Sequence, residues 1–213
     1  MNYDYGLQLA QKGFLVAALD AFNFGERMFA ADRWTHDHVC DRYFTLLQAF
    51  GYSSVGITVR GNLMALDYLA GRADVRADRI GAVGLSYGGF QVLVTAAADL
   101  RIKAAAISGA AFSYASEVIG KQATCGAQVI PGALEWFNLP DLAMSLAPRP
   151  LIFELLRHDR CFDFRDSRRI VDDVAAVYAA LGAGRFIDSD EADTDHSYIG
   201  RKVPGFFATH LPT

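Results

Sequence analysis

The sequence has few cysteines, no strong excess of charge of either sign, and no long apolar run. Its three cysteines, Cys40, Cys125 and Cys161, lie far apart and show neither zinc-binding nor redox spacing. The formal net charge of −4, without a basic cluster, argues against a nucleic-acid-binding surface. No apolar stretch reaches the roughly 18 residues of a membrane span. We therefore expect no metal site, no nucleic-acid partner and no membrane insertion.

The amino terminus does not resemble a signal peptide, and the overall composition is typical of one globular domain. Residues 1–4 do not start a basic region followed by an apolar core, so no signal peptide is visible and a cytoplasmic location is expected. A length of 213 residues with 52% hydrophobic and 21% charged residues is typical of a globular protein. Such a chain is long enough to bury a sizeable core, so the sequence predicts a single domain over residues 1–213.

Apolar runs alternate with helical patterns along the chain. We expect buried strands at residues 14–19, 80–83, 102–107, 151–156 and 185–188. We expect helices at residues 54–69, with Ser54 as N-cap, and at 90–98, 166–181 and 203–210. This alternation predicts an α/β fold with a doubly wound, mostly parallel sheet flanked by helices. Residues 110–148 form a long, glycine- and proline-punctuated segment, which we expect to be a functional loop that overhangs the turn after residues 80–83.

A candidate nucleophile follows the apolar run at residues 80–83. The sequence there reads Gly84-Leu85-Ser86-Tyr87-Gly88 and opens a helix. A G-x-S-x-G motif between a strand and a helix is the nucleophile elbow of α/β-hydrolases, with the serine in a strained turn. Gly84 and Gly88 are expected to allow close backbone approach. The Tyr87 N–H, at the start of the helix, is expected to donate to a developing oxyanion.

A serine nucleophile needs a histidine base, and in this type of site the base follows the serine along the chain. His196 lies in a polar loop after the last predicted strand, where it can reach Ser86 at the rim of the sheet. His158 adjoins the candidate acids, in the wrong loop for a base, and His210 lies near the chain end. The sequence therefore favours His196 as general base.

The orienting acid is expected in the loop after the strand at residues 151–156. Asp159, Asp163 and Asp166 compete for this role. Asp159 comes soonest after the strand, where its carboxylate can turn back toward His196 and fix the imidazole tautomer. Asp163 is the alternative, and Asp166 is predicted to be a helix N-cap. Glu154 lies inside the apolar strand itself, so it must sit at the end of the sheet or have a partner.

These motifs together resemble the dienelactone-hydrolase and acetyl-xylan-esterase-like branch of the α/β-hydrolase superfamily. The resemblance covers essentially the whole chain, and its matching stretches are residues 9–14, 20, 24–27, 78–89, 124–126, 129–132 and 147–151. It implies an α/β-hydrolase fold and ester hydrolysis through a triad of Ser86, Asp159 and His196. It also implies that neither a metal nor an organic cofactor is needed.

One departure from the family pattern concerns the oxyanion hole. The second donor normally comes from an H-G-G-G-type loop, and no such motif precedes Leu7. In the family's strand order, an internal strand between residues 14–19 and 80–84 is therefore missing. We expect an N-terminally shortened hydrolase whose sheet edges are open to self-association. Direct pairing of residues 14–19 with 80–84 would contradict this expectation.

The favoured function is a serine hydrolase that cleaves carboxylic esters with a small or carbohydrate-linked acyl group. Its partner would be a small-molecule ester. Two alternatives remain open: a serine peptidase on the same fold, or a catalytically impaired pseudo-hydrolase that acts as a binding module.

Overall fold

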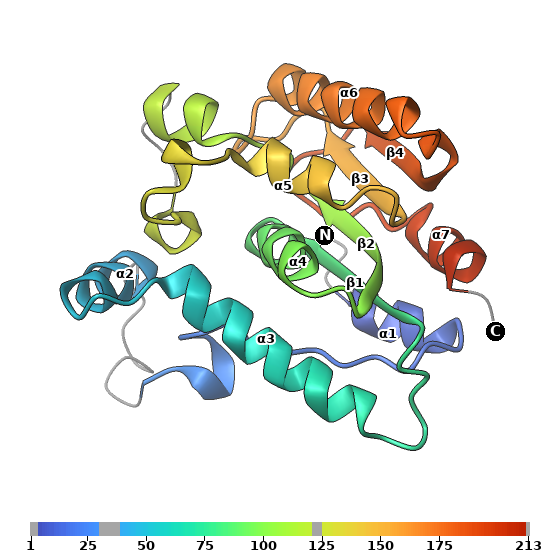
Figure 1. Cartoon of the computed structure of the whole chain (residues 1–213), viewed down its shortest axis with the longest axis horizontal. Coiled ribbons are helices and arrows are strands. Elements are labelled where there is room, and N and C mark those ends of the chain that lie inside the picture. The colour runs from blue at the N-terminus through green and yellow to red at the C-terminus, as the bar shows by residue number, and fades with distance from the viewer. Residues whose placement is uncertain (1–3, 30–38, 121–124, 212–213) are drawn as a thin grey trace.

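The computed structural model describes residues 4–29, 39–120 and 125–211. Its centre is a parallel four-stranded sheet in the order β1-β2-β3-β4 (Figure 1). The strands are β1 (Ile80–Leu85), β2 (Ile102–Ser108), β3 (Leu151–Leu156) and β4 (Ile187–Ala192). The α-helices are α1 (Tyr5–Gln11), α2 (Val39–Ala49), α3 (Ser54–Ala70), α4 (Tyr87–Ala98), α5 (Leu139–Ser145), α6 (Phe164–Ala180) and α7 (Val203–His210). The predicted doubly wound parallel sheet is thereby confirmed.

Helices cover both faces of the sheet, and the two central strands, β2 and β3, are largely apolar and buried for that reason. In β2, Ala105 and Ile107 pack into the larger core with α3, α4, α5 and α6. Their neighbours Ala104 and Ala106 pack into the smaller core with α1 and α7. Figure 1 shows α4 and α5 in front of the sheet, with α1 behind it. None of the described helices has the length and apolarity to cross a membrane.

The prediction of a strand at residues 14–19 is wrong. This segment has no regular secondary structure, and Leu15 and Leu19 are about half exposed, at 51% and 55%. An apolar run becomes a strand only when a neighbouring strand satisfies its backbone groups. Within the described ranges, β1 pairs only with β2, so residues 14–19 have no ladder partner and do not pair with residues 80–84.

Side-chain caps set the start of several helices. Ser53, rather than the predicted Ser54, caps α3 by accepting the N–H of Gly56. Ser54 is buried instead, and its hydroxyl donates to the carbonyl of Ala127 at 3.4 Å. The α5 helix begins with a capping box: the Asn138 side chain accepts the backbone N–H of Asp141, and the Asp141 side chain accepts the backbone N–H of Asn138.

The segment predicted as a long loop, residues 110–148, contains several short helices. These are the π-helix η3 (Ala115–Gly120), the 3₁₀ turns η4 (Gly126–Gln128) and η5 (Ala133–Glu135), and α5. Tyr114 anchors the segment, because its buried hydroxyl donates to the carbonyl of Gln128 at 2.6 Å. The same oxygen accepts the N–H of Ile130 at 3.1 Å. Burial raises the pKa of the Tyr114 hydroxyl to about 12.

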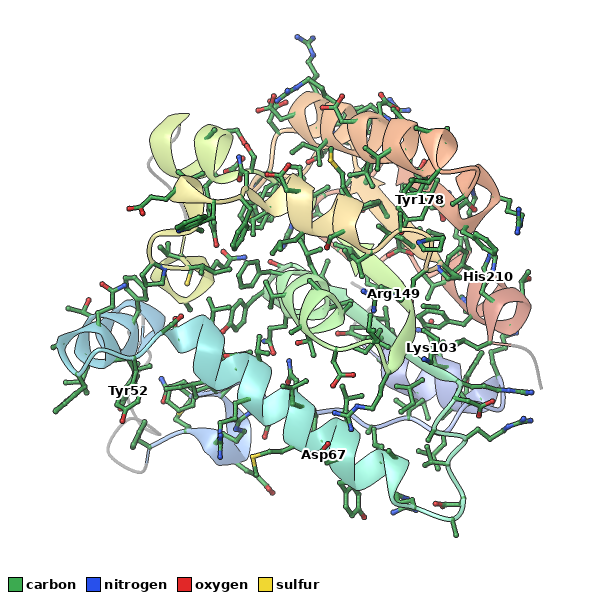
Figure 2. All side chains as sticks on the ribbon, in the orientation of Figure 1. Tyr52, Asp67, Lys103, Arg149, Tyr178 and His210 are labelled. Atoms are coloured by element: carbon green, nitrogen blue, oxygen red, sulfur yellow. The ribbon has the colours of Figure 1, made fainter. Side chains whose placement is uncertain are left out.

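Arg149 ties the amino end of the sheet to α4. Its guanidinium donates to the carbonyls of Ala96, Asp99 and Ile102 at 2.7, 3.2 and 2.9 Å. The carbonyl of Arg149 in turn accepts the hydroxyl of Tyr178 on α6, at 2.7 Å (Figure 2). Carbonyls at the end of a helix need such partners when water cannot reach them. Burial lowers the pKa of Arg149, but its five donors keep it suited to this role.

We expect Arg149→Met to lower the free energy of unfolding by about 2–4 kcal/mol, because it leaves the carbonyls of Ala96, Asp99 and Ile102 without their donor. Urea unfolding followed by circular dichroism measures the change. Arg169→Met is the matched control, since the Arg169 side chain is 64% exposed on α6. Equal losses in the two variants would refute the role of Arg149.

Candidate active site

Ser86 occupies a strained turn between β1 and α4. Its backbone has φ 57° and ψ −120°, a region that residues with a side chain rarely adopt. Its N–H donates to the carbonyl of Ser108, at the end of β2, at 2.8 Å. The turn places Ser86 at the N-cap of α4 and Tyr87 at the first helical position. The amino end of a helix favours a developing negative charge.

Two glycines make this turn possible, and one of them differs from the prediction. A Cβ on Gly84 would lie 2.3 Å from the carbonyl carbon of Gly88. A Cβ on Gly89 would lie 2.9 Å from the Cβ of Ala110. A Cβ on Gly88, however, would meet nothing within 4 Å. The close backbone approach therefore requires Gly84 and Gly89, and the prediction that it requires Gly88 is wrong.

His196 and Asp159 form a hydrogen-bonded pair. His196 Nδ1 lies 2.8 Å from Asp159 Oδ2, and the side chains are 23% and 4% exposed. The other carboxylate oxygen, Oδ1, accepts the N–H groups of Cys161 and Phe162 at 2.7 and 3.2 Å. These backbone donors hold the Asp159 carboxylate in one orientation, with its second oxygen directed at the imidazole.

The other two aspartates of this loop lie at the start of α6, with roles that differ from those predicted. Asp163 is the N-cap of α6, and its Oδ1 accepts the N–H groups of Arg165 and Asp166 at 2.9 and 3.2 Å. Asp166 therefore lies in the first turn and is not the N-cap, contrary to the prediction. Of the three aspartates, Asp159 is the one that the structure pairs with His196.

Backbone hydrogen bonds align the loops that carry Asp159 and His196. The N–H of Arg157 donates to the carbonyl of Ala192, and that of His158 to Thr194, both at 3.0 Å. These bonds continue the parallel pairing of β3 with β4 beyond the ends of the strands. The loop after each strand is therefore held beside the other, which brings the carboxylate and the imidazole together.

The turn after β2 connects the serine and histidine sides of the site. At Gly109, a Cβ would lie 3.4 Å from Cε1 of His196 and 3.3 Å from Cδ1 of Leu85. The imidazole and the Leu85 side chain, from the residue that precedes Ser86, thus both lie close to the turn at the carboxyl end of β2. Within the described part of the chain, no hydrogen bond joins the Ser86 hydroxyl to His196. The structure therefore pairs Asp159 with His196 after β3 and β4, and holds Ser86 after β1 at the same edge of the sheet.

A row of aromatic rings underlies these residues. Centroids are 6.2 Å apart for Tyr87 and Phe90, and 6.2 Å for Phe90 and Phe112. Phe112 stacks on Phe162 at 4.8 Å, and Phe162 lies 6.0 Å from the His196 ring. Sequence reasoning missed Phe90 and Phe162, because nothing in the pattern shows that their rings meet. The row gives the imidazole an apolar support on one side.

Glu154 supports the His196 loop from inside the sheet. It is 1% exposed, and its carboxylate accepts the N–H groups of Ile199 and Gly200 at 3.2 and 2.7 Å. Burial raises its pKa above the ordinary value, which those two backbone donors partly oppose. The position of a glutamate inside an apolar strand was the one sequence signal that Glu154 supports another segment. The sequence left open whether Glu154 lies at the end of the sheet or has a partner, and the structure shows that it has hydrogen-bond partners.

Comparisons with known proteins agree with this architecture. Residues 1–177 match the model of the Abhydrolase family. The chain belongs to this α/β-hydrolase family. The predicted α/β-hydrolase fold is confirmed. A protein of Bacillus subtilis (strain 168) named "Putative hydrolase YtaP" is 29% identical over 180 residues, which cover 83% of this chain and 57% of that protein.

Solved structures share the α/β-hydrolase fold. A Bacteroides fragilis protein, titled a putative acetyl xylan esterase, superposes with a TM-score of 0.71 at 21% identity, covering 97% of this chain and 56% of that one. A glucuronoyl esterase of Caldicellulosiruptor kristjansonii superposes with a TM-score of 0.59 at 17% identity, covering 74% and 50%. This α/β-hydrolase thus spans between 50% and 57% of the length of these three relatives.

The two glycines of the G-x-S-x-G motif give a sharp test of the elbow. We expect Gly84→Ala to destabilise the protein by more than about 3 kcal/mol or to prevent folding, since its Cβ would collide with backbone atoms that cannot move aside. Gly88→Ala, in α4, should leave stability unchanged or raise it by about 0.5–1 kcal/mol through helix propensity. Thermal unfolding of both variants decides the matter, and similar losses would contradict the geometry.

Proposed function

We propose that this chain is a serine hydrolase that cleaves carboxylic esters through an acyl-enzyme intermediate. The observation that carries the proposal is the hydrogen-bonded pair of His196 and Asp159, which lies at the same sheet edge as the strained elbow of Ser86. In this assignment Ser86 is the nucleophile, His196 the general base and Asp159 the orienting acid.

The proposed reaction starts with attack of the Ser86 hydroxyl on the ester carbonyl. Its proton passes to His196 Nε2, because Nδ1 is engaged with Asp159 and carries the other proton. The Tyr87 N–H, at the amino end of α4, donates to the oxyanion that forms on the carbonyl oxygen. His196 then protonates the departing alcohol, which leaves the acyl group bound to Ser86. A water molecule deprotonated by His196 hydrolyses this acyl-enzyme and restores the serine.

The choice of an ester substrate is supported by the fold neighbours. One of them is described as a putative acetyl xylan esterase and another as a carbohydrate esterase family 15 glucuronoyl esterase. We infer for this chain a small or carbohydrate-linked ester. An ester-versus-peptide substrate panel distinguishes this proposal from a peptidase on the same fold.

Removal of the nucleophile should abolish the reaction. We expect Ser86→Ala to reduce turnover of a short-chain aryl ester to the uncatalysed background, because no acyl-enzyme can form. A fluorophosphonate probe should label the wild-type protein and leave Ser86→Ala unlabelled. Undiminished turnover in Ser86→Ala would remove this residue from the mechanism, and absence of both labelling and turnover in the wild type would favour a non-catalytic module.

The two aspartates allow a matched test of the acid. We expect Asp159→Asn to lower kcat by about 10⁴, because the amide no longer holds the imidazole in the tautomer that accepts the serine proton. Asp163→Asn should retain wild-type turnover and stability, since asparagine caps a helix as well as aspartate does. Steady-state kinetics of both variants measures the difference. Equal losses of kcat would contradict the assignment of Asp159.

A further inference from the structure

A third side chain joins the pair of Asp159 and His196. One ligand atom each from Asp159, Cys161 and His196 lies within 4.8 Å of the other two. Asp159 and Cys161 come from one tight turn, in which the N–H of Cys161 donates to Asp159 Oδ1 at 2.7 Å. His196 comes from the neighbouring loop after β4. In the part of the chain that the structure describes, this is the one such group of metal-ligating side chains.

The three ligand types match a thiophilic divalent cation. Zinc is bound by thiolate, imidazole and carboxylate in tetrahedral sites, at about 2.0–2.3 Å from each ligand atom. Ligand atoms around such an ion are therefore about 3.3–3.6 Å apart. His196 Nδ1 and Asp159 Oδ2 are 2.8 Å apart, and all three ligand atoms lie within 4.8 Å of one another, so small side-chain movements bring them to this spacing. A thiolate ligand disfavours magnesium and calcium, which prefer oxygen.

The position of the group leaves room for a fourth, solvent ligand. Cys161 is an exposed residue in no disulfide, and the His196 side chain is 23% exposed. The Asp159 carboxylate lies beneath them at 4% exposure, held by its two backbone donors. Three protein ligands with a water molecule in the fourth position are an established arrangement for zinc.

We propose that Asp159, Cys161 and His196 form a site for Zn²⁺ or a similar thiophilic divalent cation, and that occupation of this site switches off the general base. Cys161 loses its thiol proton to solvent when it binds. Asp159 binds as the carboxylate, and His196 binds through Nδ1 in place of the proton that it shares with Asp159.

The inhibition follows from which nitrogen of the imidazole carries the proton, and it rests on the proposed function. A neutral imidazole that coordinates a metal through Nδ1 carries its single proton on Nε2. That nitrogen can then no longer accept the proton of Ser86. The metal also separates His196 from the carboxylate that orients it. The metal-bound protein is therefore expected to lack turnover while remaining fully folded.

Binding is tested without reference to activity. Cobalt(II), which takes zinc sites, is titrated into the full chain while the thiolate-to-cobalt charge-transfer absorption is recorded. The wild type should bind one equivalent with this band. Cys161→Ser should lose the band, and His196→Asn should bind at least about tenfold more weakly. The matched control Cys125→Ser, whose thiol lies far along the chain in another loop, should behave like the wild type.

Three results would overturn the proposal: no stoichiometric binding by the wild type, a band that persists in Cys161→Ser, or a band that is lost in Cys125→Ser. Ester turnover then tests the inhibitory role. Zinc should abolish it in the wild type and EDTA should restore it. Cys161→Ser, measured relative to its own metal-free turnover, should need at least about tenfold more zinc for half-inhibition. Equal zinc sensitivity of these two proteins would refute the switch. Because the cobalt titration needs no turnover, failure of the ester assignment and failure of the metal site are distinguishable.

Discussion

The parallel alignment of β1 to β4 is the constraint on which the candidate site depends. Parallel strands present their carboxyl ends at one edge of the sheet, so the loops that follow them are neighbours in space however far apart they are in sequence. Ser86 follows β1, Gly109 follows β2, Asp159 follows β3 and His196 follows β4. The loops after β3 and β4 stay in register beyond the strands, and this register produces the hydrogen bond between Asp159 and His196.

Two charged side chains hold β3 in place by opposite chemistry. Arg149, just before the strand, donates to three backbone carbonyls at the amino end of the sheet. Glu154, within the strand, accepts two backbone N–H groups from the His196 loop. Glu154 is buried and Arg149 is partly buried, and in each case hydrogen bonds to several backbone groups offset the cost of removing the charged side chain from water. As a result the strand that leads to Asp159 is fixed relative to α4 at one end and to the His196 loop at the other.

The same geometry suits a general base and a metal ligand. A carboxylate that holds an imidazole by Nδ1 directs Nε2 outward for proton transfer. The two groups also present an oxygen and a nitrogen at nearly the separation that zinc ligands require. Cys161 adds the thiol that turns this pair into a three-ligand group. Proton transfer and metal binding compete because both use the lone pairs of one imidazole ring.

The sequence by itself determined the parallel α/β architecture, the position of the elbow and the identity of Ser86 and His196 as candidates. Local patterns carry this information. The bounds predicted for β3 agree with the observed ones, because an apolar run between a proline and a polar loop marks both ends of the strand in the sequence itself. The resemblance to the α/β-hydrolases likewise came from short contiguous motifs, and the family match agrees with it.

The tertiary structure alone decided what depends on partners distant in sequence. Residues 14–19 have the composition of a strand, yet strand formation requires a neighbour that the described ranges do not provide. Asp163, and not Asp166, is the N-cap of α6, because the helix begins two residues earlier than its amphipathic pattern indicates. Close backbone approach made Gly89, and not Gly88, the second essential glycine. The meeting of Cys161 with His196 joins loops more than thirty residues apart, a contact that no local spacing rule encodes.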